Sequence, residues 1–274
     1  MRLCWAFMAP IMGGMNSHEL RTVFDLDAES YDRTRPVCPA ELFDDLMRAA
    51  DLRSGDQVLE IGAGTGQATL PLAERGLSVT AVELGAQLAA VARRRLAGYS
   101  DVEIVAGSFE EWTPPNRPFD AVLAVNSLHW VDPAVRYAKP AALLRPGGVM
   151  AIAATHRAQP ADAEQFWVDV QEDYRAVGYA GDPPPRPEDI DAPRFPADAL
   201  NLFDEIAGRR YPFRMVYSAD DYLANLATQS GTRALGAARM ADFLGRVRRR
   251  LESLDKSALT VDFVATLTAG RVRP

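Results

Sequence analysis

The segment VLEIGAGTGQ, at residues 58–67, constrains the fold of this chain more than any other. A short apolar run ends there in three closely spaced glycines, and the next segment, residues 65–76, has helical spacing and a glycine stop. A strand, a glycine-rich turn and a helix in this order are typical of a parallel α/β sheet, whose ligands bind beyond the carboxyl ends of the strands. Glycines there let the backbone approach a ligand closely and adopt a positive φ. These features predict a ligand site at residues 62–66.

The flanking sequence repeats this alternation of strand and helix. Apolar runs predict strands at residues 57–61, 77–83, 102–107, 119–125 and 149–155. Helical spacing predicts helices at residues 39–52, 65–76, 86–98 and 131–145, with a turn at RPGG, residues 145–148. Strands separated by helices of this length imply a doubly wound, parallel sheet with right-handed crossovers.

Beyond Thr155 the alternation stops, and longer inserts precede two more strands. Helices are expected at residues 163–177, 218–231 and 233–255, strands at 209–218 and 258–272, and a proline-rich loop at 180–199. The basic run at 246–250 could bind phosphate, but its arginines are expected to face water instead, because acidic residues flank the run. We therefore expect an α/β fold with a Rossmann-like, doubly wound, seven-stranded sheet, mostly parallel with the last strand antiparallel at or near one edge, plus helical cap inserts.

A length of 274 residues favours one large domain or two small ones, and we expect a single domain over residues 31–274. Its core would span about residues 39–154, its cap inserts about 155–203 and 218–256, and its final strands about 205–217 and 258–270. Residues 1–30 are expected to form a partly flexible N-terminal extension. The start faintly resembles a signal peptide, but its single basic residue, Arg2, favours a dispensable extension with Met15 as an alternative start.

Two acidic residues indicate which ligand the glycine loop binds. A dinucleotide fingerprint needs a third glycine where this chain has Gln67, and no Gly-Lys-Ser/Thr ending of a phosphate loop is present in the sequence. Glu60, two residues before the first glycine, suits an ammonium group better than a pyrophosphate. Glu83, at the end of the next strand, can accept hydrogen bonds from both hydroxyls of a ribose. S-adenosylmethionine combines an ammonium group, a sulfonium charge and a ribose diol, so the pattern favours it as the cofactor.

With these residues the sequence resembles the class I S-adenosylmethionine-dependent methyltransferases, and within them the small-molecule branch of methyltransferase type 11 domains and trans-aconitate-type enzymes. The resemblance covers about residues 24–154, in the segments FDLDAESYDRTRPVCPAEL, VLEIGAGTGQ, ELGAQLAAVARRRL, GSFEEW, NSLHWVDP and LLRPGG. One position departs from the pattern, since Cys38 stands where the branch often has a tyrosine.

The resemblance and the two acids together imply a set of cofactor-binding residues. Residues 62–64 would line the methionine part, Glu83 and Leu84 would hold the ribose and flank the adenine, and Asn126 would lie near the methionine end. An aromatic residue and an arginine from the N-terminal segment would close the pocket. The full set is Tyr31, Arg35, Glu60, Gly62, Ala63, Gly64, Gly66, Glu83, Leu84, Ser108, Phe109 and Asn126.

The candidate catalytic residue is His129, which follows the fourth strand, where the active-site crevice is expected. Histidine can act as a general base near neutral pH, and a hydroxyl acceptor profits from one, whereas a carboxylate acceptor needs none. The alternative is that His129 only shapes the pocket. Aromatic residues are candidates for a partly apolar substrate pocket: Trp130, Phe166, Trp167, Tyr174 and Tyr222.

Several other chemistries lose support because their motifs are absent. Residues 126–129 read Asn-Ser-Leu-His, which is neither the Asn/Asp-Pro-Pro-aromatic motif of amino methylation nor an acidic metal-ligand set, so no metal is expected. Two cysteines, Cys4 and Cys38, cannot form a three-cysteine radical motif or a disulfide framework, and they suit a reducing, cytoplasmic compartment.

We expect methyl transfer to a small molecule at oxygen, either a hydroxyl or a carboxylate. Open alternatives are transfer to nitrogen or carbon, a nicotinamide-dependent oxidoreductase, and a non-catalytic cofactor-binding module. A formal charge of −7 disfavours nucleic acid as a partner, and no apolar run is long enough to cross a membrane. The chain would act as a monomer or a homodimer.

Overall fold

The computed structural model describes residue 25 and residues 27–161, 164–178, 183–254 and 258–274. They fall into two compact units, each built from three stretches of the chain. The core unit consists of residues 37–155, 192–211 and 265–274, and the helical unit of the described parts of residues 1–36, 156–191 and 212–264. The expected N-terminal extension, with Cys4, Met15 and His18, lies almost wholly outside the described residues.

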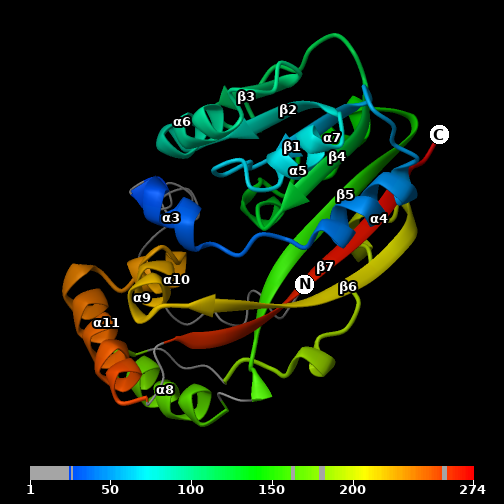
Figure 1. Cartoon of the computed structure of the whole chain (residues 1–274). Coiled ribbons are helices and arrows are strands. Elements are labelled where there is room, and N and C mark those ends of the chain that lie inside the picture. The colour runs from blue at the N-terminus through cyan, green and yellow to red at the C-terminus, as the bar shows by residue number, and fades with distance from the viewer. Residues whose placement is uncertain (1–24, 26, 162–163, 179–182, 255–257) are drawn as a thin grey trace. The chain divides into compact units, whose positions relative to one another are not determined.

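The sheet has seven strands in the order β3-β2-β1-β4-β5-β7-β6 (Figure 1). The strands are β1 (Gln57–Ile61), β2 (Ser78–Glu83), β3 (Val102–Ala106), β4 (Phe119–Val125), β5 (Leu144–Ala158), β6 (Phe203–Tyr217) and β7 (Leu259–Val272). The four neighbouring pairs among β1 to β5 are parallel. β7 runs in the opposite direction to β5, one place in from the edge. The predicted fold class is confirmed.

The central strands β1, β2 and β4 are buried along almost their whole length. Their apolar side chains contribute to the hydrophobic cluster of the core unit, in which Leu59, Val122 and Met150 are fully buried. Parallel strands that are covered on both faces read as continuous apolar runs, and for this reason the sequence predicts them well.

The helices of the core unit are shorter than their sequence patterns predict. They are α4 (Ala40–Ala50), α5 (Thr69–Glu74), α6 (Ala86–Arg95) and α7 (Ala138–Leu143), with a 3₁₀ turn, η2 (Leu128–Trp130), and another, η5 (Ala197–Ala199). The chain makes turns at residues 64–68 before α5 begins, so the helix expected from residue 65 starts four residues later. Of the helix expected at 131–145, only residues 138–143 are helical; residues 133–137 form turns, which begin where Asp132 accepts a bond from the backbone N–H of Ala134.

The turn predicted at RPGG is instead an irregularity inside β5. Phe119 pairs with Leu144, but Ala121 pairs with Val149, so the register jumps across residues 145–148. Gly147, with φ of 74°, provides the left-handed conformation that this bulge requires. The strand therefore begins at Leu144 and not at residue 149.

The helical unit contains α3 (Ala28–Thr34), α8 (Glu164–Ala176), the 3₁₀ turn η4 (Pro187–Asp189), α9 (Ala219–Ala227), α10 (Ser230–Arg233) and α11 (Ala237–Glu252). Ser218 caps α9 by accepting a bond from the N–H of Asp221. The helix predicted at 233–255 begins four residues later, at Ala237, because Gly236 adopts φ of 78° between α10 and α11. α11 packs against α8, α9 and α10 around an aromatic core (Figure 1).

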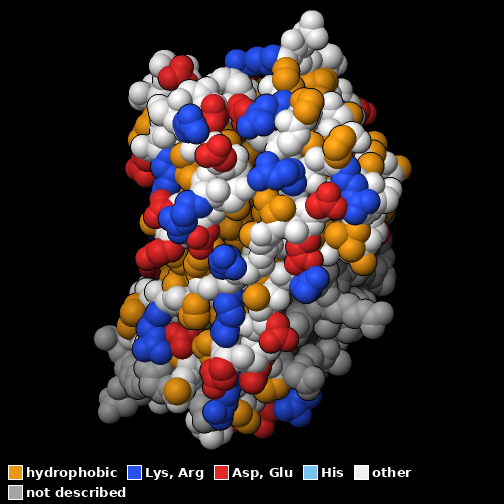
Figure 2. Space-filling view, turned by 90° about the vertical axis from the view of Figure 1, so that its right-hand side faces the viewer, with side chains coloured by type: hydrophobic (Ala, Val, Ile, Leu, Met, Phe, Trp, Pro, Cys, Tyr) orange, Lys and Arg blue, Asp and Glu red, His pale blue; other side chains and the backbone are white. Residues whose placement is uncertain are grey.

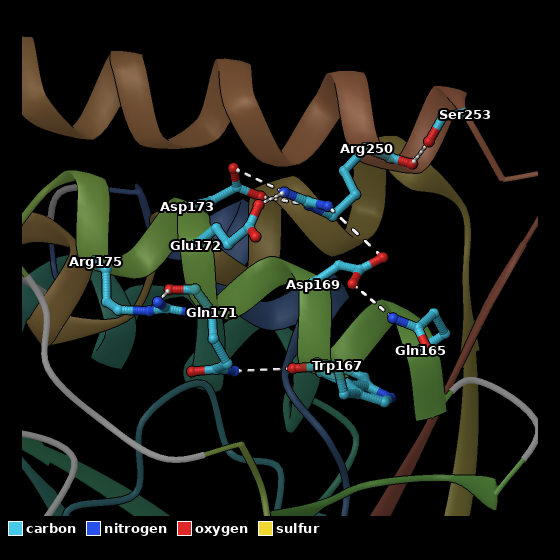
Figure 3. Close-up of polar contacts among 9 residues, drawn as sticks. All are labelled: Gln165, Trp167, Asp169, Gln171, Glu172, Asp173, Arg175, Arg250 and Ser253. Atoms are coloured by element: carbon cyan, nitrogen blue, oxygen red, sulfur yellow. Dashed lines mark hydrogen bonds and ion pairs between the residues drawn. The ribbon is translucent and has the colours of Figure 1, made fainter.

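Arg250 holds α11 against α8 and does not face water, which corrects that expectation. Its guanidinium binds Asp173 at 2.7 Å and lies 3.5 Å from Glu172 and 3.9 Å from Asp169 (Figure 3). Asp173 is 6% exposed, so this ion pair is screened little by solvent. Arg246 also pairs with an acid, Asp242, at 3.0 Å. The basic run is thus largely neutralised by this unit's own carboxylates.

Candidate cofactor and active site

The glycine loop leaves the carboxyl end of β1 in a left-handed conformation. Gly62, Gly64 and Gly66 have φ of 75°, 58° and 81°, values that side chains disfavour. A Cβ on Gly62 would overlap the side chain of Ser127, and one on Gly66 would lie 3.0 Å from Leu96. Two of the glycines are therefore required by packing within the core unit as well as by backbone conformation.

Glu83 connects this loop to the end of β2. One carboxylate oxygen accepts a hydrogen bond from the backbone N–H of Gly64 and the other from that of Gly85, each at 2.7 Å. The carboxylate is 7% exposed, so burial and the two N–H groups fix its position. The structure thus brings together the two features, Glu83 and the glycine loop, that the sequence predicts to bind one ligand. Leu84, which follows Glu83, is half-buried.

Glu60 lies beneath the loop and is 1% exposed. It accepts a hydrogen bond of 2.6 Å from the hydroxyl of Thr69. Burial, opposed by the Thr69 bond and reinforced by the negative charge of Glu83, raises the pKa of Glu60 to about 8. At pH 7 this carboxyl is therefore mostly protonated. The pairing of Glu60 with an ammonium group of the ligand stays a prediction. It requires that the bound cation lower the pKa of Glu60.

Asn126 ends β4 in a left-handed conformation, with φ of 54°. Its side-chain oxygen accepts the backbone N–H of Thr155 at 2.8 Å, and its side-chain nitrogen lies 3.4 Å from the Thr155 hydroxyl. The same hydroxyl lies 3.7 Å from the sulfur of buried Cys38, whose pKa is raised by burial. Thr155 thus joins the ends of β4 and β5 to Cys38. The sequence pattern did not identify Thr155, because nothing local marks it.

Ser108 and Phe109 follow β3 in a turn that Lys139 stabilises. The Lys139 ammonium donates to the carbonyls of Phe109 and Trp112 at 2.6 Å each and to that of Glu110 at 3.1 Å. Phe109 is 5% exposed, and the Ser108 hydroxyl donates to Glu110 at 2.7 Å. The family resemblance implies that Ser108 and Phe109 lie at the edge of the adenine ring, and this placement stays a prediction. No local sequence pattern marks Lys139 for this role.

His129 lies in the 3₁₀ turn after β4, half-buried, with its ring centroid 4.8 Å from that of Trp130. Burial and the nearby positive charge of Arg136 lower the pKa of His129 to about 4. Its imidazole is therefore neutral at pH 7, which is the protonation state that a general base requires. An imidazole with such a low pKa is a weak base. His129 would therefore accept a proton only in the step in which the acceptor oxygen loses it.

The other predicted site residues belong to the helical unit. The Arg35 guanidinium lies 4.7 Å from the ring centroid of Tyr31 and donates to the carbonyl of Thr228 at 3.0 Å. Four of the aromatic candidates for the substrate pocket pack together in the hydrophobic core of this unit. Phe166, Trp167 and Tyr222 are at most 3% exposed, and Tyr174 is partly buried. Closure over the cofactor and selection of the acceptor by these residues stay predictions.

Among the residues that the structure describes, no three His, Cys, Asp or Glu side chains are grouped so that they could hold a metal ion. No described helix has the length and apolar character that crossing a membrane requires. Basic and acidic side chains are interspersed over the face drawn in Figure 2.

Comparison with known proteins identifies similar methyltransferases. A methyltransferase domain model matches residues 58–148. A methyltransferase of Mycobacterium tuberculosis that has not been characterised is 38% identical over 154 residues, which are 56% of this chain and 58% of that protein. One of Geobacillus kaustophilus is 32% identical over 50% of this chain and 67% of its own length. The chain therefore spans little more than half of the mycobacterial relative.

A solved structure supports the same assignment. A protein of Anaeromyxobacter dehalogenans, described as a type II methyltransferase, is 25% identical, with a TM-score of 0.58 over 88% of this chain and 99% of that one. The domain match begins in β1 and ends in the bulge of β5, so it covers the glycine loop, Glu83 and His129. With its seven-stranded sheet and this loop, the chain belongs to the class I S-adenosylmethionine-dependent methyltransferases, whose cofactor is S-adenosylmethionine.

Proposed function

We propose that this protein transfers a methyl group from S-adenosylmethionine to a small molecule, at an oxygen atom of a hydroxyl or a carboxylate. The observation that carries the proposal is the position of Glu83, whose two oxygens accept the N–H groups of Gly64 and Gly85. A carboxylate oxygen accepts more than one hydrogen bond, so Glu83 can hold the loop and still accept the two hydroxyls of a ribose.

The residues at this edge of the sheet fit such a cofactor. The Gly64 backbone, at φ of 58°, forms part of a turn that approaches a ligand without a side chain. Asn126 is exposed at the end of β4, with its side chain oriented by Thr155. When bound, the cofactor supplies an electrophilic methyl group on a positively charged sulfur. The contribution of the protein is to orient the acceptor, exclude water and receive a proton.

His129 is the residue that we assign to the proton. Its neutral imidazole can accept a proton from a hydroxyl acceptor as the new C–O bond forms, and the imidazolium then passes that proton to solvent. For a carboxylate acceptor, which carries no proton to remove, His129 would only orient the substrate. We extend the proposal to a cytoplasmic site of action, because two cysteines and no expected disulfide suit a reducing compartment.

Glu83→Ala is expected to weaken S-adenosylmethionine binding by about 1–3 kcal/mol, because hydrogen bonds to a charged group are lost. Isothermal titration calorimetry measures this change directly. Glu83→Gln, which keeps one acceptor oxygen, is expected to give a smaller loss. The matched control is Glu103→Ala, which removes an exposed carboxylate from the adjacent strand β3. Equal affinities for wild type and Glu83→Ala would refute the assignment of Glu83 to the ribose.

Turnover is tested separately from binding. Wild-type protein is incubated with radiolabelled S-adenosylmethionine and a fractionated small-molecule extract, and S-adenosylhomocysteine and labelled products are measured. We expect a labelled product whose methyl group is bound to oxygen. A label on nitrogen or carbon would correct the acceptor atom, and tight cofactor binding without any turnover would favour a non-catalytic module.

A further inference from the structure

Lys139 is the only lysine in the described part of a chain that otherwise uses arginine. Two of the 30 Lys and Arg residues are lysines, and the other one, Lys256, lies outside the described residues. Lys139 is the second residue of α7, and its side chain is half-buried within the core unit. The contacts of this side chain indicate why the chain has an ammonium group at this position.

Three backbone carbonyls of one turn, residues 108–112, converge on the Lys139 ammonium. It donates to the carbonyls of Phe109 and Trp112 at 2.6 Å each and to that of Glu110 at 3.1 Å. It also lies 4.9 Å from the ring centroid of Phe109 and 5.8 Å from that of Trp112. An ammonium group carries its three donors on one atom, whereas the donors of a guanidinium are spread over a plane. A lysine therefore suits this arrangement of acceptors better than an arginine.

The turn 108–112 is fastened to the chain that follows η2 by Glu110 as well as by Lys139. The Glu110 carboxylate accepts the backbone N–H of Asp132 at 3.0 Å and the Ser108 hydroxyl at 2.7 Å. The three carbonyls point at one atom, so without the ammonium their dipoles would repel one another and each would lose its donor. Such a loss costs free energy at partly buried positions. We therefore expect the turn to open when Lys139 is replaced.

The same turn begins next to Glu83. The strands β2 and β3 are neighbours at one edge of the sheet, with Glu83 paired to Ala106 (Figure 1). The backbone N–H of Gly107 donates to the Glu83 carbonyl at 2.8 Å, and a Cβ on Gly107 would meet no atom within 4 Å, so there is open space beside it. In a nucleoside the base is joined to the carbon next to the 2′-hydroxyl carbon. A ribose whose hydroxyls bind Glu83 therefore brings its base close to the start of this turn.

We propose that Lys139 is a positioning residue for the adenine ring of the cofactor. By holding the carbonyls of the turn 108–112, it fixes the backbone against which the ring lies, without touching the ring itself. The inference rests on the proposed function, in which Glu83 binds the ribose, and it deepens that function by naming the residue on which recognition of the base depends. All of the groups that it uses belong to the core unit.

Two ligands isolate the contribution of the base. S-adenosylhomocysteine and S-ribosylhomocysteine share the homocysteine and the ribose, and only the first has an adenine. Calorimetry measures both dissociation constants for wild type and for Lys139→Met, which keeps an unbranched stem without the charge. We expect Lys139→Met to bind S-adenosylhomocysteine at least about tenfold more weakly and S-ribosylhomocysteine less than about twofold more weakly. The control is Arg117→Met, which removes an exposed charge from the loop between the turn and β4 and should change neither constant.

A second variant, Lys139→Arg, provides the measurement if the methionine variant does not fold. It keeps the positive charge, but its planar donors on a longer side chain cannot converge on the three carbonyls in the same way. We expect its affinity for S-adenosylhomocysteine to lie between those of wild type and Lys139→Met, with the affinity for S-ribosylhomocysteine again nearly unchanged. Both ligands are measured on the same preparation, so a partly unfolded sample lowers both apparent affinities alike and leaves their ratio unchanged.

The proposal is overturned if the ratio of the two dissociation constants equals that of wild type in every Lys139 variant that folds. A purely structural Lys139 would give that result, together with a lower melting temperature. This outcome differs from a failure at Glu83, where unchanged S-adenosylmethionine binding in Glu83→Ala would remove the ribose contact on which the inference rests. An unchanged ratio in the Lys139 variants, with the expected loss in Glu83→Ala, overturns the role of Lys139 alone.

Discussion

Glu60→Gln is expected to stabilise the protein at pH 9 and to leave its stability at pH 5 almost unchanged. The glutamine has the shape of the protonated carboxyl and can still accept the hydrogen bond of Thr69. The pKa of Glu60 is raised to about 8 in the folded protein, against about 4.5 for the ordinary group. The folded state therefore holds more protons than the unfolded state between these two values, so wild-type stability falls as the pH rises through this window.

The expected difference in the free energy of unfolding between wild type and Glu60→Gln follows from these two pKa values. At 1.36 kcal/mol for each pKa unit, the loss of wild-type stability caused by charging Glu60 approaches about 5 kcal/mol above pH 8, whereas it is less than about 1 kcal/mol at pH 5. Urea unfolding of wild type and Glu60→Gln at pH 5, 7 and 9 measures it. Glu103→Gln, at an exposed position of β3, is the control and should show no such trend. Equal stability of wild type and Glu60→Gln at pH 9 would show that Glu60 ionises normally.

His129→Ala is expected to lower kcat by about 10²–10⁴ with a hydroxyl acceptor, the usual contribution of a positioned base, and to leave cofactor affinity nearly intact. With a carboxylate acceptor the same change should mainly raise KM. Steady-state kinetics on the identified acceptor distinguishes the two cases. Because the pKa of His129 is lowered to about 4, its protonation should not affect kcat between pH 5 and 8.

A second variant separates catalysis from packing. His129→Gln can fill the same space and form hydrogen bonds, but it cannot take up a proton. If His129 is the base, the glutamine variant should be as slow as the alanine variant. If His129 only shapes the surface next to Trp130, glutamine should restore most of the activity. Wild-type kcat in both variants with a proven hydroxyl acceptor would exclude His129 as the base and leave the cofactor assignment unaffected.

Features that depend only on residues close together in the sequence could be predicted. The strands from β1 to β4 read as apolar runs because both of their faces are buried, and the glycine loop is marked by residues that turn the chain within five positions. Glu83 was identified because it ends one such run. These patterns predict the sheet, the loop and their meeting at one edge.

Features that depend on distant partners were not predicted. The requirement for glycine at position 62 comes partly from Ser127, which is remote in sequence and packs against it only in the folded chain. The bulge at residues 145–148 reflects pairing with β4, which has no local signal. Gly236 delays the start of α11 to Ala237, and the helical period alone does not mark this boundary. The low pKa of His129 likewise depends on burial and on Arg136.

The position of β7 has a consequence for synthesis on the ribosome. In the sheet β7 lies between β5 and β6, although it follows both in the chain. When β6 has emerged, neither β5 nor β6 has yet paired with β7, and the gap between them stays open until residues 259–272 leave the exit tunnel. During that interval two long strands expose unpaired backbone edges, which favour pairing with other chains. A nascent chain of this protein therefore depends on late closure of its sheet, and stalling between β6 and β7 should recruit chaperones.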